Sequence, residues 1–187
     1  SGREARAHSL RSLAPYAKIW MLSSLIYFAV SGLASNGIGH WEPNYRFWPA
    51  TWSSDNELPW LFTEAIRQGW DLKRLFGGGW LPTDRPPLMA GAYLLLADTF
   101  GWLQSGNDGT YLRGQTYNTA AIVLNTLWVP ACWWLLIALR RELDYRGRIA
   151  ILLFVGCLPF VIFNTIYGWP KAFGAAFALV AFGLAWQ

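Results

Sequence analysis

The chain has 187 residues, of which 54% are hydrophobic, only 14% are charged and 13 are tryptophans, with a formal net charge of +4. A soluble domain usually carries about 25% charged residues, so this composition excludes an ordinary soluble fold and predicts an all-α, polytopic membrane protein. The positive charges gather in two short clusters, which is typical of the cytoplasmic ends of membrane helices and gives no reason to expect nucleic-acid binding.

The first predicted element is a membrane-crossing helix over residues 16–38. Four basic residues precede or open this apolar run: Arg3, Arg6, Arg11 and Lys18. The positive-inside rule therefore puts the N-terminus in the cytoplasm, and the length of the run favours a retained helix over a cleaved signal peptide. Because the sequence begins with Ser1 and ends at Gln187 within an apolar pattern, we expect residues 1–187 to be the N-terminal part of one membrane domain of a longer protein.

The external segment 39–85 comes next and contains a short amphipathic helix over residues 57–68. Its apolar residues have the spacing of one helix face: Leu58, Leu61, Phe62, Ala65 and Ile66. Gly69 suits the C-terminal end of such a helix. We expect the apolar face to lie on the outer membrane surface, and Glu64, on another face, to be a solvated residue.

Residues 86–104 form the third predicted element, an interfacial helix. If this run and the next, 117–139, both crossed the membrane, the arginine-rich residues 140–148 would be external, against the positive-inside rule. The run 86–104 carries Asp98, which would cost about 2.5–3.5 kcal/mol at the centre of a bilayer, so we assign the run to the interface. The remaining crossings are helices 117–139, 149–166 and 172–187, and we expect two of them to be kinked by an internal proline, Pro130 or Pro159.

Two acidic residues precede the amphipathic helix, and their position leaves two compatible roles open. Asp55 lies at or just before the helix N-terminus, where a carboxylate caps the helix with a stabilisation of about 1 kcal/mol. The helix dipole also keeps such a carboxylate ionised. Asp55, with Glu57 beside it, is therefore also a candidate catalytic group facing an external cavity.

Two basic residues and two tryptophans complete the candidate site. Arg85, directly before Pro86–Pro87, can bind a phosphate bidentately or can anchor in lipid headgroups. Lys171 can anchor the last helix or join Arg85 around an anion. Trp52 and Trp60 either belong to an interfacial aromatic belt or stack on the face of a sugar. No spacing typical of a metal site, such as C-x-x-C or H-E-x-x-H, occurs in the sequence.

The order of these features resembles the GT-C superfamily of membrane glycosyltransferases, and in particular the protein O-mannosyltransferases and the lipid A aminoarabinose transferases. The matching motifs are Asp55-Asn56-Glu57 in the first external loop, Arg85-Pro86-Pro87-Leu88 before the interfacial helix, "LADTFGW" (96–102) at its end, and Arg113 before the next crossing. The resemblance covers residues 16–187.

The resemblance implies an inverting transfer of a sugar from a polyprenyl-phosphate donor to a glycan, lipid or protein acceptor in the cell envelope. The enzyme would be a multi-pass protein of the plasma (inner) membrane with an extracytoplasmic active site. Asp55 would be the general base and Glu57 its support, with binding of a divalent cation, Mg²⁺ or Mn²⁺, as an alternative role for the same carboxylates. Arg85 and Lys171 would bind the donor phosphate, and Trp52 and Trp60 would stack on the sugar.

A second class of function fits the same sequence: a transporter or flippase for a lipid-linked sugar, or a non-catalytic subunit of a membrane assembly. A transporter places polar groups at mid-membrane in discontinuous helices. Here the predicted crossings carry little charge, and the carboxylates are concentrated in the external segment 39–85. This distribution favours an external reaction site.

The charge argument generates a topology prediction. In a background without Cys132 and Cys157, Ser105→Cys should react with an impermeant thiol reagent in intact cells, because residues 105–116 are predicted to be external. Arg146→Cys should react only after the membrane is permeabilised. Labelling of position 146 but not of 105 in intact cells would contradict the interfacial assignment of 86–104.

Overall fold

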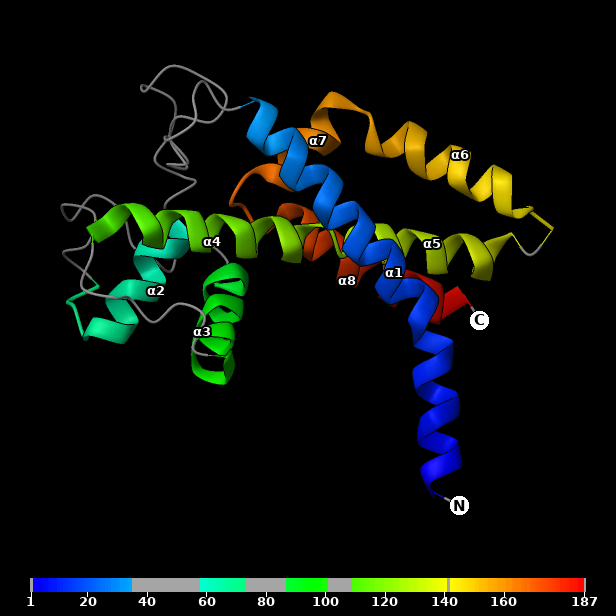
Figure 1. Ribbon diagram of the computed structural model, residues 1–187, viewed down its shortest axis with the longest axis horizontal. Coiled ribbons are helices and arrows are strands. Elements are labelled where there is room, and N and C mark those ends of the chain that lie inside the picture. Colours follow the sequence, from blue (N-terminus) through cyan, green and yellow to red (C-terminus); the bar gives the residue numbers. More distant parts are fainter. Residues whose placement is uncertain (1, 35–57, 73–86, 101–108, 141, 187) are drawn as a thin grey trace.

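The computed structural model describes residues 2–34, 58–72, 87–100, 109–140 and 142–186, and within these ranges it contains eight α-helices and no strand (Figure 1). The all-α class predicted from the sequence is therefore confirmed for this part of the chain. The helices are α1 (Gly2–Ala34), α2 (Leu58–Gln68), α3 (Leu88–Phe100), α4 (Gly109–Asn125), α5 (Trp128–Leu139), α6 (Tyr145–Gly156), α7 (Pro159–Ile166) and α8 (Lys171–Trp186).

Two of the described helical stretches are long and apolar enough to cross a bilayer. They are Ser12–Leu33 within α1 and Thr116–Leu139, which runs from α4 into α5, and both overlap predicted crossings. Helices α3 and α8 are apolar but shorter. At 1.5 Å per residue, α3 reaches about 20 Å, less than the ~30 Å of a hydrocarbon core. The interfacial position of α3 and the direction of each crossing stay predictions.

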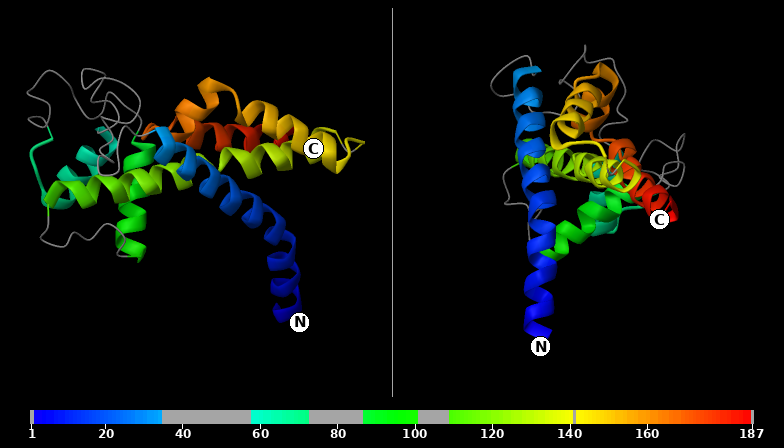
Figure 2. Two further views of the ribbon diagram at one scale, coloured as in Figure 1. Left: turned by 45° about the horizontal axis from the view of Figure 1, so that its top comes forward. Right: turned by 90° about the vertical axis from the view of Figure 1, so that its right-hand side faces the viewer.

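Helix α1 begins much earlier than the predicted boundary at residue 16. It starts at Gly2, so the basic tail is helical as well. The tail is rich in arginine, alanine, leucine and glutamate, which have high helix propensities, and the apolar run continues the same helix. Pro15 lies inside α1, and the helix is visibly bent between its two ends (Figures 1 and 2), as expected where a proline removes a backbone hydrogen bond.

The kink predicted at Pro159 within the crossing 149–166 is a complete break of the helix. This part of the chain forms α6 and α7, which meet at an angle of 75°. Pro159 opens α7 and has no N–H to donate, so the Val155 carbonyl accepts a hydrogen bond from the N–H of Leu158 at 3.1 Å instead. The proline thus separates two helices, and together they make at most one broken span.

The junction of α4 and α5 is a milder interruption of the same kind. The two helices run on in nearly one line (Figure 1), although Pro130 has no N–H for the Thr126 carbonyl. That carbonyl accepts from the N–H of Val129 at 3.0 Å, and the N–H of Leu127 turns to Leu124 at 3.2 Å. This tightened turn releases the carbonyl of Val123 from its usual helical partner.

Side chains of α1 satisfy carbonyl groups at both interruptions. The indole Nε1–H of Trp20 donates to Val123 O at 2.8 Å, and the hydroxyl of Tyr27 donates to Gly156 O, at the end of α6, at 2.9 Å. Between them, Ser24 Oγ lies 2.7 Å from Thr126 Oγ1, which itself donates to Val123 O at 2.8 Å. Since Thr126 has one hydroxyl proton, Ser24 is the donor to Thr126. One polar stripe of α1 therefore holds α4–α5 and α6 together.

A buried amide joins α4 to the turn between α7 and α8. Asn125 is fully buried, and its Nδ2 donates to the carbonyl of Tyr167 at 2.8 Å. Its Oδ1 accepts from the backbone N–H of Phe173 in the first turn of α8 at 3.1 Å. The N–H of Phe173 belongs to the first turn of α8, whose N–H groups have no partner within the helix itself. Asn125 therefore caps α8 from another helix.

The most extensive helix–helix contact in the described structure is that of α5 with α8. Gly183 of α8 lies directly under the ring of Trp134, where an added Cβ would be 2.8 Å from Cη2 and also within 3.1 Å of Leu135 Cδ1. A glycine at this position lets the two helix backbones approach, as small residues commonly do between membrane helices.

Two substitutions in α8 should separate this packing from helix propensity. Gly183→Ala and Gly174→Ala gain the same propensity, but at Gly174 a Cβ would meet only Leu88 Cδ2 at 3.9 Å. We expect Gly183→Ala to have a free energy of unfolding lower than that of Gly174→Ala by about 1–3 kcal/mol, the usual cost of overpacking. Denaturant titration of the purified protein in detergent measures the difference, and equal stabilities would contradict the close α5–α8 contact.

Candidate functional site

The amphipathic helix α2 forms where the sequence predicted it, and Gly69 ends it as expected. Gly69 has φ +67°; its N–H donates to Ile66 O at 3.4 Å, and the N–H of Trp70 donates to Ala65 O at 2.9 Å. These are the two bonds of a Schellman motif. The helix begins at Leu58, so by sequence position Glu57 is adjacent to its first residue and Asp55 lies two residues further out.

The buried side of α2 carries polar residues as well as part of the predicted apolar face. Its buried residues are Thr63, Glu64 and Ala65; Ala65 belongs to the apolar face, whereas Ile66 of the same face is 45% exposed. The prediction that Glu64 is solvated was wrong, because this side chain is only 3% exposed. Polar side chains can form interhelical contacts inside a protein that is surrounded by lipid, and α2 buries Thr63 and Glu64.

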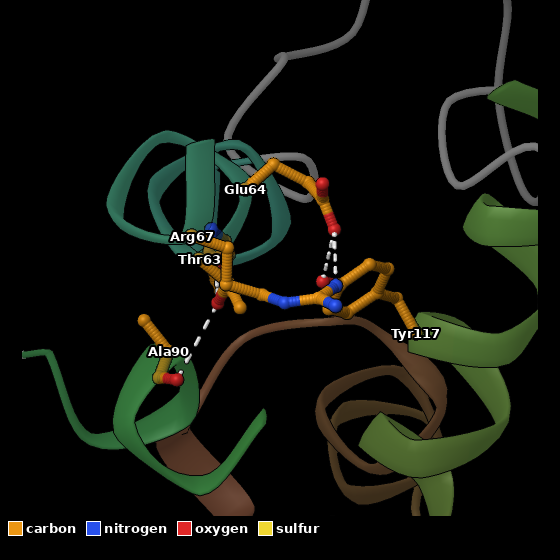
Figure 3. Close-up of polar contacts among 6 residues, drawn as sticks. Thr63, Glu64, Arg67, Ala90 and Tyr117 are labelled. Atoms are coloured by element: carbon orange, nitrogen blue, oxygen red, sulfur yellow. Dashed lines mark hydrogen bonds and ion pairs between the residues drawn. The ribbon is translucent and has the colours of Figure 1, made fainter. Parts of the chain in front are cut away.

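A short polar network explains how the glutamate is tolerated (Figure 3). The hydroxyl of Tyr117, in α4, donates to Glu64 Oε1 at 2.6 Å, and Arg67 Nη1 contacts the same oxygen at 3.2 Å. Burial of a carboxylate is costly unless it is paired and hydrogen-bonded, and Glu64 has both kinds of partner. The network therefore fixes α2 against the start of the Thr116–Leu139 span.

Helix α3 and the first turn of α8 pack at the same end of α4. Thr63 Oγ1 donates chiefly to Pro59 O at 2.7 Å, and the carbonyl of Ala90, in α3, lies 3.4 Å away (Figure 3). One hydrophobic cluster contains residues from all four helices, with Trp60 of α2 packed against Met89, Tyr117 and Phe173 among others. Helices α2 and α3 thus lie at one end of the α4–α5 line, whereas α6 reaches the other end (Figures 1 and 2).

The turn before α8 forms an aromatic and cationic corner, which consists of Phe163, Tyr167, Trp169 and Lys171. The rings of Phe163 and Tyr167 stack with centroids 4.9 Å apart, and Trp169 meets Tyr167 edge-on at 4.7 Å. The ammonium of Lys171, an exposed residue, lies 3.7 Å from the centroid of the Trp169 ring. This geometry is a cation–π contact. The corner combines a positive charge with aromatic faces at the first residue of α8.

Two of the predicted site residues fall within the described ranges, and the structure brings their helices into one cluster. Lys171 opens α8, and Trp60 packs with its ring centroid 6.0 Å from that of Tyr117. Trp52, Asp55, Glu57 and Arg85 lie outside the described residues. Among the described residues no group of three histidine, cysteine or acidic side chains lies together in a form suited to a metal ion.

Sequence reasoning missed the pairing of Glu64 with Tyr117. The available signal was the spacing of Trp60, Thr63, Glu64 and Arg67, which form their own i, i+3, i+4, i+7 stripe. Both stripes have regular helical spacing. The sequence does not show which of them is directed toward lipid. Comparisons of the chain with protein-family models, with curated proteins and with solved structures find no match.

The network around Glu64 generates a stability prediction. Tyr117→Phe removes one donor from a buried carboxylate and should lower the free energy of unfolding by about 1–3 kcal/mol. Glu64→Gln keeps an acceptor oxygen and should cost less than Tyr117→Phe. In the Glu64→Gln background, Tyr117→Phe should lose much of its effect, since the bond to a charged acceptor is already gone.

Denaturant titration of the four proteins in detergent measures this cycle, and hydrogen exchange of α2 amides reports whether the helix detaches. Tyr145→Phe is the control, because Tyr145 is 66% exposed. Additive effects of the two substitutions would mean that the charge of Glu64 does not strengthen the 2.6 Å contact, and an unchanged stability of Tyr117→Phe would mean that the contact contributes nothing to holding α2.

Proposed function

We propose that the chain is part of a membrane glycosyltransferase that moves a sugar from a polyprenyl-phosphate donor to an acceptor on the extracytoplasmic side of the membrane. The two candidate spans make a membrane location reasonable. The order of acidic, amphipathic and basic-proline motifs supports the GT-C resemblance.

The proposed chemistry uses the four charged site residues. Asp55 takes the proton of an acceptor hydroxyl as its oxygen forms a bond to C1 of the sugar. The bond from C1 to the phosphate oxygen breaks, and polyprenyl phosphate leaves with the electron pair. Arg85 and Lys171 stabilise the negative charge that develops on the phosphate. Glu57 orients the acceptor, or holds a divalent cation together with Asp55.

The observation that carries the proposal is the clustering of the helices that adjoin these residues. Leu58 follows Glu57 directly, Leu88 stands three residues after Arg85, and Lys171 opens α8. The start of α3 meets the start of α8, because Leu88 lies against Gly174, and α2 is bound to α4 through Glu64. Segments that are more than 100 residues apart in sequence therefore adjoin one cluster. This is the arrangement that a single donor and acceptor site requires.

One observation favours the second candidate function, a transporter for a lipid-linked sugar. The 75° break between α6 and α7, and the buried Asn164 and Thr165 within α7, resemble the discontinuous helices of transporters. Translocation of a fluorescent polyprenyl-phospho-sugar by proteoliposomes, without any transferred product, would favour this candidate over the enzyme.

Asp55→Asn in the full-length protein tests the enzyme. The substitution keeps the size of the side chain and its capacity as a helix cap but removes the base, so the rate of transfer should fall by about 10²–10⁴-fold. The assay measures transfer from a panel of polyprenyl-phospho-sugars to endogenous acceptors in membranes that contain the protein.

Asp71→Asn is the matched control, since Asp71 is an exposed carboxylate just after α2, and it should transfer at the normal rate. Near-normal transfer by Asp55→Asn would remove the residue from the mechanism. If wild-type transfer continues in EDTA while Asp55→Asn is inactive, the carboxylate acts as a base and not as a metal ligand.

A further inference from the structure

Asn118 of α4 carries a buried amide that has no hydrogen-bond partner among the described residues. The residue is 3% exposed, and within this part of the chain neither Oδ1 nor Nδ2 is paired. Buried polar groups are almost always paired, and an exception calls for a specific explanation. Asn118 is also close to the first residue of the Thr116–Leu139 candidate span.

Asn125 shows what a structural amide looks like at an equivalent place. It lies seven residues after Asn118, which is almost two full helical turns, so both side chains leave the same face of α4. Both ends of the Asn125 amide are used, on Tyr167 O and on the N–H of Phe173. Asn125 therefore bridges two backbone groups, whereas Asn118, on the same face of α4, has no partner among the described residues.

The aromatic and cationic corner lies on the side of α4 from which the Asn125 side chain projects. Helix α4 packs against both α7 and α8, and Asn125 bonds to the two ends of the turn that carries Trp169. By helical register Asn118 faces the same side, about 10 Å further toward the start of α4. The corner offers an ammonium and two aromatic rings of intermediate exposure, and Asn118 adds an amide on the same side of α4.

We propose that Asn118 binds hydroxyl groups of the sugar on a polyprenyl-phosphate donor whose phosphate is held by Lys171. This inference rests on the proposed function and adds the residue that recognises the sugar. An amide donates and accepts at once, as a sugar hydroxyl does. Asn118 lies near one end of the candidate span, which suits a lipid whose tail lies in the bilayer and whose sugar lies at its surface.

The first test is a comparison of stability, and it needs no ligand. Asn118→Leu replaces an unpaired amide by an apolar group of similar size, which is neutral or stabilising for a buried group without partners. Its melting temperature in detergent should equal or exceed that of the wild type. Asn125→Leu, the matched control, leaves Tyr167 O and the Phe173 N–H unpaired and should melt about 5 °C lower or more. A similar loss in Asn118→Leu, or failure to fold, would show that the Asn118 amide is structural and would overturn the proposal.

The second test measures binding to the full-length protein in nanodiscs. The probes are bare polyprenyl phosphate and a panel of its esters with a hexose, an N-acetylhexosamine and an aminopentose. The wild type should bind at least one ester more tightly than the bare lipid. Asn118→Leu should weaken binding of that ester by about tenfold or more, which corresponds to about 1.4 kcal/mol, and leave the bare lipid unchanged. Lys171→Met should weaken both.

The outcomes separate this inference from the proposed function. Wild-type protein that binds none of the lipids contradicts both proposals. Wild-type protein that prefers a sugar ester, with the preference intact in Asn118→Leu, contradicts the role of Asn118 alone. If the wild type binds every ester no more tightly than bare polyprenyl phosphate, the role of Asn118 is also contradicted.

Discussion

Prolines within apolar helices leave backbone carbonyl groups that must find new donors, and the described structure is organised around these groups. In an apolar environment an unpaired carbonyl costs several kcal/mol. Two of the donors, Trp20 and Tyr27, lie on one stripe of α1, and Ser24 between them donates to the hydroxyl of Thr126. Because they lie on one face of one helix, the carbonyl of Val123 and that of Gly156 are held at a fixed separation. The relative position of α4–α5 and α6 follows from this constraint.

Both α1 and α2 bury polar side chains. On α1 the buried residues include Ser23, Tyr27 and Ser31, whereas its large apolar side chains are exposed, Leu22, Leu25 and Ile26 among them. On α2 the buried residues include Thr63 and Glu64. In water, exposure of these apolar side chains would be unfavourable. In lipid, exposed apolar side chains are favourable, and interhelical hydrogen bonds contribute to the specificity of packing. The orientation of α1 is therefore compatible with a membrane environment.

The candidate site depends on this framework at two points. The Glu64–Tyr117 bond keeps α2 at the end of α4, and Asn125 ties the turn before α8 to the same helix. The proposed acidic and basic groups adjoin elements held in this way. A reaction between a lipid-linked donor and an acceptor needs such control, because positioning of the reacting groups supplies a large share of catalysis. Asn118 differs from these structural contacts in having an amide that the fold leaves unused.

The sequence by itself determined the all-α class, two candidate spans, the position of α2 and its stop at Gly69. These features depend on composition, on apolar run length and on local backbone preferences, all of which are legible within a few consecutive residues. Only the tertiary structure decided that Glu64 is buried, that residues 149–166 form two helices, and that Asn118 and Asn125 differ. Helical spacing shows which residues share a face but not whether that face meets lipid or protein. Partners such as Tyr27 and Gly156 are 129 residues apart, so only folding reveals which polar groups are satisfied.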